Sequence, residues 1–249
     1  MIKDNKNTGN QLEELKAENE YLKKESELKT AWISLISHDF KGTFSNFLVL
    51  IEAWEQKSIS DTYFFKLLPE VKHDIQKNLQ TITDTGTWIK TQSDGFKLQQ
   101  SEIYAVELYL HLKQMFQKKL KNKHLQFVFE GPESIKVHTD RLLIAFILKK
   151  IFDNAIKYSH PESSIFFKVT ESRNGTTFSI TDQGIGMDQK QTETIFSFDS
   201  PVFRGTEGET GAGLSMKIIK KFVCLLDGNI EIESTINKGT IVSVFLRRH

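Results

Sequence analysis

The chain has 249 residues, more than the roughly 100–200 residues of one typical domain, and this length predicts two domains. Its hydrophobic fraction of 39% and charged fraction of 26% are ordinary for a globular protein and exclude disorder throughout. Thirty-three Lys and Arg against 32 Asp and Glu give a net charge of +1. That balance provides no global field for nucleic acid or an anionic membrane, so we expect neither as a partner.

Two features of the sequence predict an intracellular location: the lack of an apolar targeting segment and the single cysteine. No stretch approaches the roughly 18 apolar residues that a membrane-spanning helix needs, and the first residues, MIKDNKNTGNQ, lack the apolar core of a signal peptide. The single cysteine, Cys224, lies in the apolar run KKFVCLL, which predicts a buried structural thiol. We therefore expect a cytoplasmic protein with no membrane span.

The first 30 residues predict a coiled-coil lead-in. Residues 11–29 are charged and favour helix, with Leu12, Leu15 and Leu22 at heptad spacing and Asn19 at the intervening core position. Such a segment reads as a connector from an upstream sensory module or protein.

Residues 31–95 predict a helical hairpin. Apolar side chains recur in steps of three and four along two segments, and the turn between them falls near KSISD. Pro69 is expected either to start the second helix or to kink it. Two amphipathic helices offer each other too little surface, so we expect a homodimer with a four-helix bundle. The two stripes are Ile33, Ile36, Phe40, Phe44, Phe47, Ile51 and Trp54, and then Phe64, Leu68, Val71, Ile75, Leu79, Ile82 and Ile89.

From residue 96 to residue 249 the pattern alternates between helices and strands. Helices are expected at 106–121, 139–157 and 214–226, and strands at 125–130, 164–170, 176–181, 229–234 and 240–246. Helices grouped against a mainly antiparallel sheet make an α+β sandwich.

A histidine lies on the first predicted hairpin helix. His38 stands two residues from both Ile36 and Phe40, so its imidazole points away from the apolar stripe. Taken alone it is most simply a solvated side chain. It is nevertheless free to attack phosphorus as a nucleophile, and Asp39 beside it could orient the ring or accept its proton.

Two short motifs in the second domain carry polar groups suited to a nucleotide. In DNAIKYS, Asn154 and Lys157 share one helix face and combine an oxygen able to ligate Mg²⁺ with an ammonium for phosphate. In DQGIGM, Asp182 ends a strand and can accept a hydrogen bond from an amino group such as that of adenine. Gly184 and Gly186 permit a tight turn with the backbone close to a ligand.

A glycine-rich loop, FRGTEGETGAGLSM, precedes the last predicted helix. Its glycines and the helix N-terminus suit a loop that covers phosphate groups. A dinucleotide-binding fingerprint is excluded, because no G-x-G-x-x-G follows a strand.

In this order the motifs resemble the phosphoacceptor and nucleotide-binding boxes of sensor histidine kinases, whose ATP-binding domain shares its fold with gyrase and the Hsp90 chaperones. Four stretches further resemble kinases of the Bacteroidetes type: LLPEVKHDIQ, TWIKTQ, FRGTEGETG and VHTDRLL. The resemblance implies three parts: a lead-in at 1–30, a dimerisation and phosphoacceptor domain at 31–95, and an ATP-binding catalytic domain at 96–249.

The resemblance also implies a cycle in which the dimer binds ATP and Mg²⁺, His38 takes the γ-phosphoryl group, and a response regulator receiver domain receives it. Asp39 would be the acid/base neighbour, and Asn154 the Mg²⁺ ligand. The implied nucleotide contacts are Asn154, Lys157, Tyr158, Asp182, Gly184, Gly186, Arg204, Gly211, Gly213 and Thr240.

Four positions depart from the family pattern. Lys150 replaces an Asn one turn before Asn154, and a cation there could repel Mg²⁺ or contact phosphate. Ser215 replaces the third glycine of the loop, and Asn237 stands where glycine is common but accepts left-handed angles. Gly42 stands where phosphatase-competent members carry Thr or Asn. It predicts weak phosphatase activity, a hypothesis testable by adding phosphorylated regulator and following its dephosphorylation.

The departures leave an alternative open. The chain could be a degenerate, catalytically weak dimer that binds nucleotide as a scaffold, or a phosphotransfer protein whose His38 is charged by another kinase.

Overall fold

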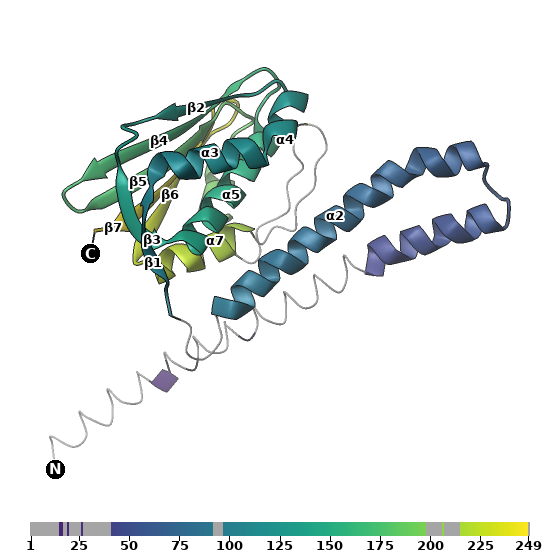
Figure 1. Ribbon diagram of the computed structural model, residues 1–249, viewed down its shortest axis with the longest axis horizontal. Coiled ribbons are helices and arrows are strands. Elements are labelled where there is room, and N and C mark those ends of the chain that lie inside the picture. Colours follow the sequence, from purple (N-terminus) through teal and green to yellow (C-terminus); the bar gives the residue numbers. More distant parts are fainter. Residues whose placement is uncertain are drawn as a thin grey trace, which may run out of the picture. The chain divides into compact units, whose positions relative to one another are not determined.

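In a computed structural model of the protein, residues 15–16, 19, 26, 41–91, 97–197, 206 and 215–248 are described (Figure 1). The chain divides into two compact units, residues 1–96 and 97–249. Within the described ranges, no helix is long and apolar enough to cross a membrane.

The first unit contains a helix over residues 41–55 and a longer helix, α2 (Asp61–Thr91). The turn between them is fixed by side chains: the Trp54 indole N–H donates to the Asp61 carboxylate over 2.8 Å, and the Trp54 ring stacks on Phe64 at 4.9 Å. Lys57 in the turn adopts a left-handed φ of 56°. Pro69 lies inside α2, eight residues after its start, so it does not begin the helix.

Many large apolar side chains of this unit remain exposed in the single chain. Four residues of the predicted apolar stripes are half-buried: Phe47, Ile51, Phe64 and Leu68. The exposed large hydrophobics of residues 41–91 are Phe44, Leu48, Val49, Trp54, Tyr63, Phe65, Leu79, Ile82 and Ile89.

The second unit is built on a five-stranded sheet with the order β2-β4-β5-β7-β6, accompanied by an antiparallel pair of β1 with β3. Only the β2–β4 pairing of the larger sheet is parallel. The strands are β1 (Gln100–Tyr104), β2 (Gln126–Glu130), β3 (Lys136–Asp140), β4 (Ser164–Ser172), β5 (Gly175–Asp182), β6 (Gly228–Thr235) and β7 (Gly239–Arg247). The helices are α3 (Ala105–Met115), α4 (Gln117–Asn122), α5 (Arg141–Tyr158), α6 (Gln189–Thr194) and α7 (Ser215–Leu225).

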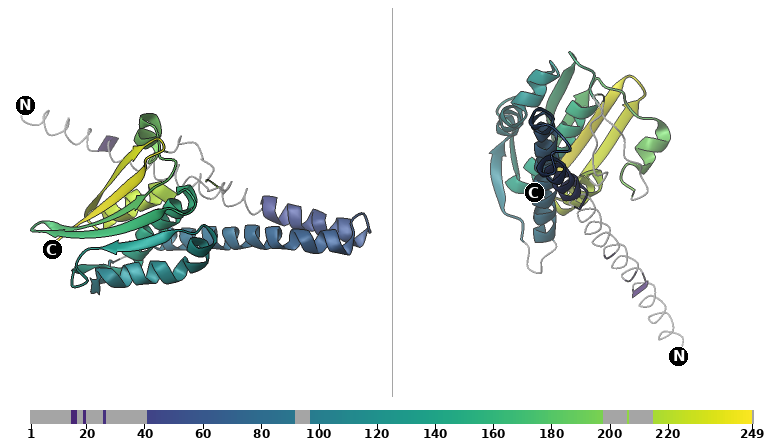
Figure 2. Two further views of the ribbon diagram at one scale, coloured as in Figure 1. Left: turned by 90° about the horizontal axis from the view of Figure 1, so that it is seen from above. Right: turned by 90° about the vertical axis from the view of Figure 1, so that its right-hand side faces the viewer.

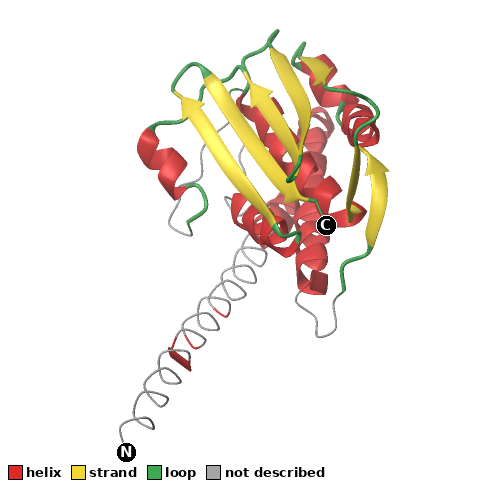
Figure 3. Cartoon of the chain, turned by 90° about the vertical axis from the view of Figure 1, so that its left-hand side faces the viewer, coloured by secondary structure: helices red, strands yellow, loops and turns green. Residues whose placement is uncertain are grey.

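Helices cover one face of this sheet and leave the other open (Figure 3). Alternate residues of each strand point toward the helices, as the two-residue period of a strand requires. Phe152 of α5, Phe167 of β4, Phe178 of β5 and Phe222 of α7 are all 0% exposed and form the centre of the core. The short helix α6 lies beside the edge strand β6 (Figure 2).

The structure confirms the expected sandwich of helices on a mainly antiparallel sheet. It corrects three local expectations. The helix expected at 106–121 is two helices separated at Phe116, and the helix expected from 139 begins at Arg141, because Thr139 and Asp140 belong to β3. The sequence reading also lacked β1, β3 and α6.

The cysteine expectation was wrong. Cys224 is exposed on α7, although its neighbours Phe222 and Val223 are 0% exposed. One apolar run on a helix presents both a buried and an outward side, and Cys224 falls on the outward one.

Candidate functional site

The helix α5 carries the first group of candidate side chains at its C-terminal end. Its start is fixed by Asp140, whose carboxylate accepts hydrogen bonds from the backbone N–H groups of Leu142 and Leu143 over 3.0 and 3.1 Å. Its apolar side, which includes Ile147 and Ile151, is buried against the sheet and α7. Because α5 is anchored at its start and along one side, its last turn has a defined position and presents polar side chains.

Asn154, Lys157 and Tyr158 are half-buried on this last part of α5. The Asn154 amide nitrogen lies 3.5 Å from the sulfur of Met216 in the first turn of α7. The Lys157 ammonium donates to the Tyr158 hydroxyl over 3.0 Å and lies 4.7 Å from the centre of the Tyr158 ring. An amide, a cation and an aromatic ring are therefore neighbours at one end of the helix.

Asp182 ends β5 with a buried carboxylate, 6% exposed. It accepts a hydrogen bond from the Gly184 backbone N–H over 2.9 Å, and the Thr240 backbone N–H also bonds to it. Burial raises the pKa of the Asp182 carboxyl to about 7, against the lowering effect of these two backbone donors. Thr240 thus joins Asp182 through its backbone, while its hydroxyl pairs with the Ser234 hydroxyl at 2.8 Å.

The loop after Asp182 is pressed against the end of α5, and only glycine fits there. A Cβ on Gly184 would lie 2.1 Å from the Tyr158 carbonyl oxygen. Gly186 has a φ of 62°, and its Cβ would lie 2.0 Å from the Thr235 oxygen. The Ile185 N–H donates to the Tyr158 carbonyl over 3.2 Å. The DNAIKYS and DQGIGM segments are therefore in direct contact.

The hairpin between β6 and β7 completes this region. Asn237 adopts a left-handed φ of 58°, which confirms that Asn is accommodated there, and its N–H donates to the Ile185 carbonyl over 2.8 Å. Gly239, which the sequence reading did not single out, has a φ of 93°, and a Cβ there would lie 1.9 Å from the Asp182 carbonyl oxygen. The K-G-T turn next to Thr240 was the signal that could have identified it.

One residue of the glycine-rich segment is described. The Thr206 N–H donates to the Lys157 carbonyl over 3.1 Å, and its hydroxyl donates to the Ser159 carbonyl over 3.0 Å. These hydrogen bonds join Thr206 to the end of α5. Arg204, Gly211 and Gly213 lie outside the described residues, as do His38 and Asp39 in the first unit.

Lys150 lies one turn before Asn154 on the same face of α5. Its ammonium is 5.7 Å from the centre of the Phe146 ring, and Phe146 contacts Phe222 of α7 edge-on at 5.0 Å. Ser215 is the first residue of α7. Both departures from the family pattern are thus accommodated in regular helices.

A metal ion would have few ligands of its own here. Across the described residues there is no group of three or more His, Cys, Asp or Glu side chains able to hold one. The Asn154 amide oxygen is a hard donor, and Mg²⁺ commonly takes one or two protein oxygens together with phosphates and water. The donor set therefore fits a Mg²⁺ that arrives with a nucleotide.

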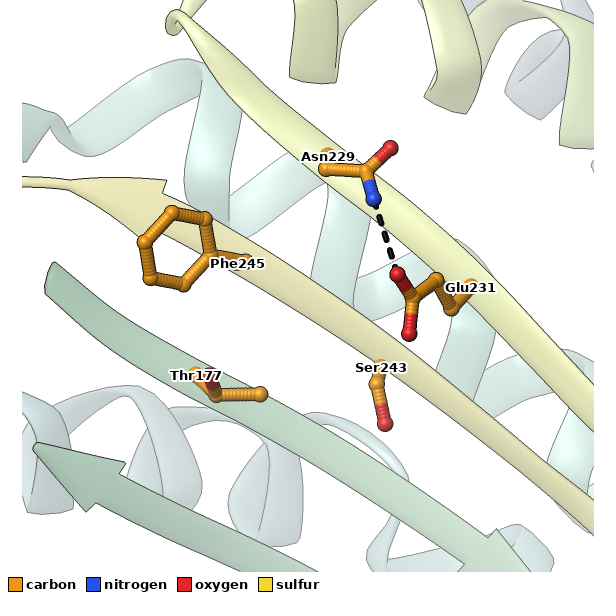
Figure 4. Close-up of a pocket in the computed structure, with 5 residues that line it drawn as sticks. All are labelled: Thr177, Asn229, Glu231, Ser243 and Phe245. Atoms are coloured by element: carbon orange, nitrogen blue, oxygen red, sulfur yellow. Dashed lines mark hydrogen bonds between the residues drawn. The ribbon is translucent and has the colours of Figure 1, made fainter. Parts of the chain in front are cut away.

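A hollow of about 260 Å³ lies elsewhere, on the open face of the sheet (Figure 4). It is lined by Thr177, Asn229, Glu231, Ser243 and Phe245, and the Asn229 amide donates to Glu231 over 3.0 Å. Thr177 alternates with the inward-facing Thr176 and Phe178 of β5, so this hollow is on the opposite side of the sheet from the core. It contains none of the candidate site residues.

Comparison with known proteins gives a consistent result. Residues 139–249 match the family described as histidine kinase-, DNA gyrase B-, and HSP90-like ATPase. The adaptive-response sensory kinase SasA of Gloeothece citriformis is 24% identical over 234 residues, which are 91% of this chain and 59% of that protein. The sensor histidine kinase WalK of Bacillus subtilis is 25% identical over 224 residues, 86% of this chain and 36% of that protein. The chain thus spans less than two thirds of these relatives.

Two solved structures share the fold. A histidine kinase AdeS chain of Acinetobacter baumannii is 16% identical and covers 84% of this chain and 97% of its own, with a TM-score of 0.67. Histidine kinase ThkA, solved in complex with response regulator protein TrrA, is 19% identical and covers 86% of this chain and 59% of its own, with a TM-score of 0.63.

Proposed function

We propose that the chain is the transmitter module of an ATP-dependent protein-histidine kinase, whose nucleotide-binding part lies in the region that matches the histidine kinase-, DNA gyrase B-, and HSP90-like ATPase family, residues 139–249. In this proposal His38 is the phosphoacceptor, and a receiver domain of a response regulator takes the phosphoryl group from it. The observation that carries the proposal is the contact between the end of α5 and the Asp182 loop.

The nucleotide would bind where these two segments meet. Asp182, with its carboxylate at the end of β5, would accept a hydrogen bond from the amino group of adenine, and Tyr158 would flank the nucleotide. Lys157 would contact phosphate oxygens, and Gly184 and Gly186 would let the backbone approach closely. Asn154 would hold a Mg²⁺, which supplies charge neutralisation for the phosphates.

Phosphoryl transfer then needs alignment more than covalent assistance from the protein. A nitrogen of the His38 imidazole would form a bond to the γ-phosphorus as the bond to the β–γ bridging oxygen breaks, which releases ADP. Asp39 would accept the imidazole proton. In the second step a receiver aspartate oxygen would attack the same phosphorus and free the imidazole. Arg204, Gly211, Gly213 and Thr240 would complete the surroundings of the nucleotide.

The dimeric state of the proposal is supported by the first unit. Phe44, Leu48, Leu79 and Ile82 are each at least 44% exposed in the single chain, and their burial against a second copy would remove this apolar surface from water. A homodimeric four-helix bundle is the arrangement expected from the hairpin. The named ThkA–TrrA complex supports a response regulator as the protein partner.

The test is incubation of the purified chain with γ-labelled ATP and Mg²⁺, beside the His38→Gln and Asn154→Ala variants. The proposal predicts an acid-labile, base-stable label on the wild-type chain and no label on either variant. Unlabelled wild-type protein that still binds ATP would instead indicate the scaffold alternative. A wild-type chain that is labelled only by an added second kinase would indicate a phosphotransfer protein.

A further inference from the structure

A buried lysine holds the end of α5 from behind. Lys123, the residue that directly follows α4 and caps it, is 3% exposed, and its ammonium donates to the carbonyl oxygens of Ile156 over 2.8 Å and of Lys157 over 3.0 Å. Lysine is rarely buried to this extent, so its position at these two carbonyls needs a physical reason.

The reason is the C-terminal end of α5. The last carbonyl groups of a helix have no partners within the helix, and they carry the negative end of its dipole. The Ala155 carbonyl accepts from the Ser159 N–H and hydroxyl, and the Tyr158 carbonyl accepts from the Ile185 N–H. The two carbonyls between them accept from the Lys123 ammonium, so each of the four has a donor.

The lysine backbone is fixed as well. The Lys123 N–H donates to the Lys119 carbonyl over 3.2 Å, and its own carbonyl accepts from the Glu162 N–H over 3.0 Å. The next residue, His124, turns the chain away with a left-handed φ of 53°. The backbone N–H and carbonyl from which this side chain extends are therefore both hydrogen-bonded.

The carbonyl of Lys157 is shared. It accepts from the Lys123 ammonium and also from the Thr206 N–H, over 3.0 and 3.1 Å, and the Thr206 hydroxyl lies 3.2 Å from it. The Lys157 and Tyr158 side chains project from the same turn. One turn of helix thus receives a cation from α4 and a donor from the glycine-rich segment.

We propose that Lys123 is a positioning residue for the nucleotide: its buried ammonium keeps the last turn of α5 in the conformation in which Asn154, Lys157 and Tyr158 face a common ligand. This inference extends the proposed function and depends on it. Without the ammonium, the Ile156 and Lys157 carbonyls both lose their charged donor, so the turn frays and its side chains diverge.

The test compares the ATP affinity of the full chain with that of Lys123→Met and Lys119→Met, by calorimetry with Mg²⁺. Methionine matches the length of lysine but removes the charge and the donors. Lys119 is the matched control, because it also reaches α5, through Asp153 at 2.5 Å, but from an exposed position. We expect Lys123→Met to weaken ATP binding at least 5-fold and Lys119→Met to change it less than 2-fold.

Folding and positioning are separated by measuring the dissociation constant well below the unfolding temperature, with circular dichroism as the check. A structural role alone lowers the unfolding temperature but leaves the affinity of the folded protein unchanged, and that result would overturn the proposal. If the wild-type chain itself did not bind ATP, that result would contradict the proposed function, on which this inference depends.

Thr206→Val supplies a second test that leaves the buried lysine in place. It removes the hydroxyl that reaches the Lys157 and Ser159 carbonyls, with almost no change in volume. We expect ATP affinity to fall about 2- to 4-fold. An unchanged ATP affinity of Thr206→Val would contradict the proposal. This result can be obtained even if Lys123→Met does not fold.

Discussion

The two units of the chain differ in the exposure of their large apolar side chains. In residues 97–248 the sheet and its helices enclose a core in which Phe152, Phe167 and Phe178 are 0% exposed. In residues 41–91 side chains of similar size, such as Phe65 at 62% and Leu48 at 58%, stay exposed in the single chain. The first pattern is that of a self-sufficient domain, and the second leaves apolar surface exposed, as the proposed dimer requires.

In the proposed reaction the two units have separate roles: the second would bind the nucleotide, and the first would carry the phosphoacceptor. A closed core fixes the end of α5 and the Asp182 loop, so the nucleotide site would be preformed in each chain. The hairpin would gain its stability from association between two chains. Each of the following changes tests one side of the contrast.

The largest expected effect is the loss of a core ring. Phe167→Ala should lower the free energy of unfolding by about 3–5 kcal/mol, because it removes a fully buried side chain and leaves a cavity. Leu110→Ala, at a position of α3 that is 55% exposed, should cost less than about 1 kcal/mol. Urea unfolding followed by circular dichroism measures both, and equal losses would contradict the contrast.

The next effect concerns association. Leu79→Glu places a charge at an exposed apolar position of α2, 56% exposed in the single chain, and should weaken dimerisation about 100-fold, because the charge would have to be buried in the bundle. Autophosphorylation should fall with it while ATP affinity stays the same. Sedimentation equilibrium gives the oligomeric state, with Lys72→Glu as the control on an exposed polar position. A Leu79→Glu variant that dimerises normally would exclude this surface from the interface.

A smaller effect follows from the buried carboxyl. Because burial raises the pKa of Asp182 to about 7, from an ordinary value of 3.8, folding is favoured by its protonated form. The stabilisation is complete below about pH 4 and is lost as pH rises through 7. The gain in the free energy of unfolding caused by Asp182→Asn should therefore be about 2–3 kcal/mol larger at pH 8.5 than at pH 5. A pH-independent difference would show that the carboxyl does not titrate in this way.

The smallest effect is expected at an exposed ion pair. Lys119 and Asp153 join α4 to α5, but their side chains are 58% and 39% exposed. Lys119→Met should lower the free energy of unfolding by no more than about 0.5 kcal/mol, because water and salt screen the pair. Thermal unfolding at low and high salt measures it, and a loss above 1 kcal/mol would indicate a structural role that the exposure does not suggest.

Much of the second unit could be predicted from the sequence. Its sheet strands alternate between inward and outward residues, and the sandwich followed from them. The errors arose where patterns merge: Thr139 and Asp140 precede the apolar run of α5 without a break, although Asp140 is in fact its N-terminal cap. The strands β1 and β3 pair only with each other and carry few apolar residues, which left no clear period to read.

Only part of the candidate site could be predicted from the sequence. The resemblance picked out Asn154, Lys157 and Asp182, and the structure brings their segments together, although their roles stay proposals. Lys123 and Thr206 were not predicted. Both act on backbone carbonyls of α5, and a sequence motif of side chains does not show which backbone groups need a donor.

The most direct test of the account is to locate the phosphoryl group on the full chain. After incubation with ATP and Mg²⁺ at neutral pH, peptides would be prepared under alkaline conditions and analysed by mass spectrometry, beside the Asn154→Ala variant. The account predicts a single phosphorylated residue, His38, and none in the variant. A phosphoryl group on any other residue, or an unmodified His38 in protein that binds ATP, would contradict it.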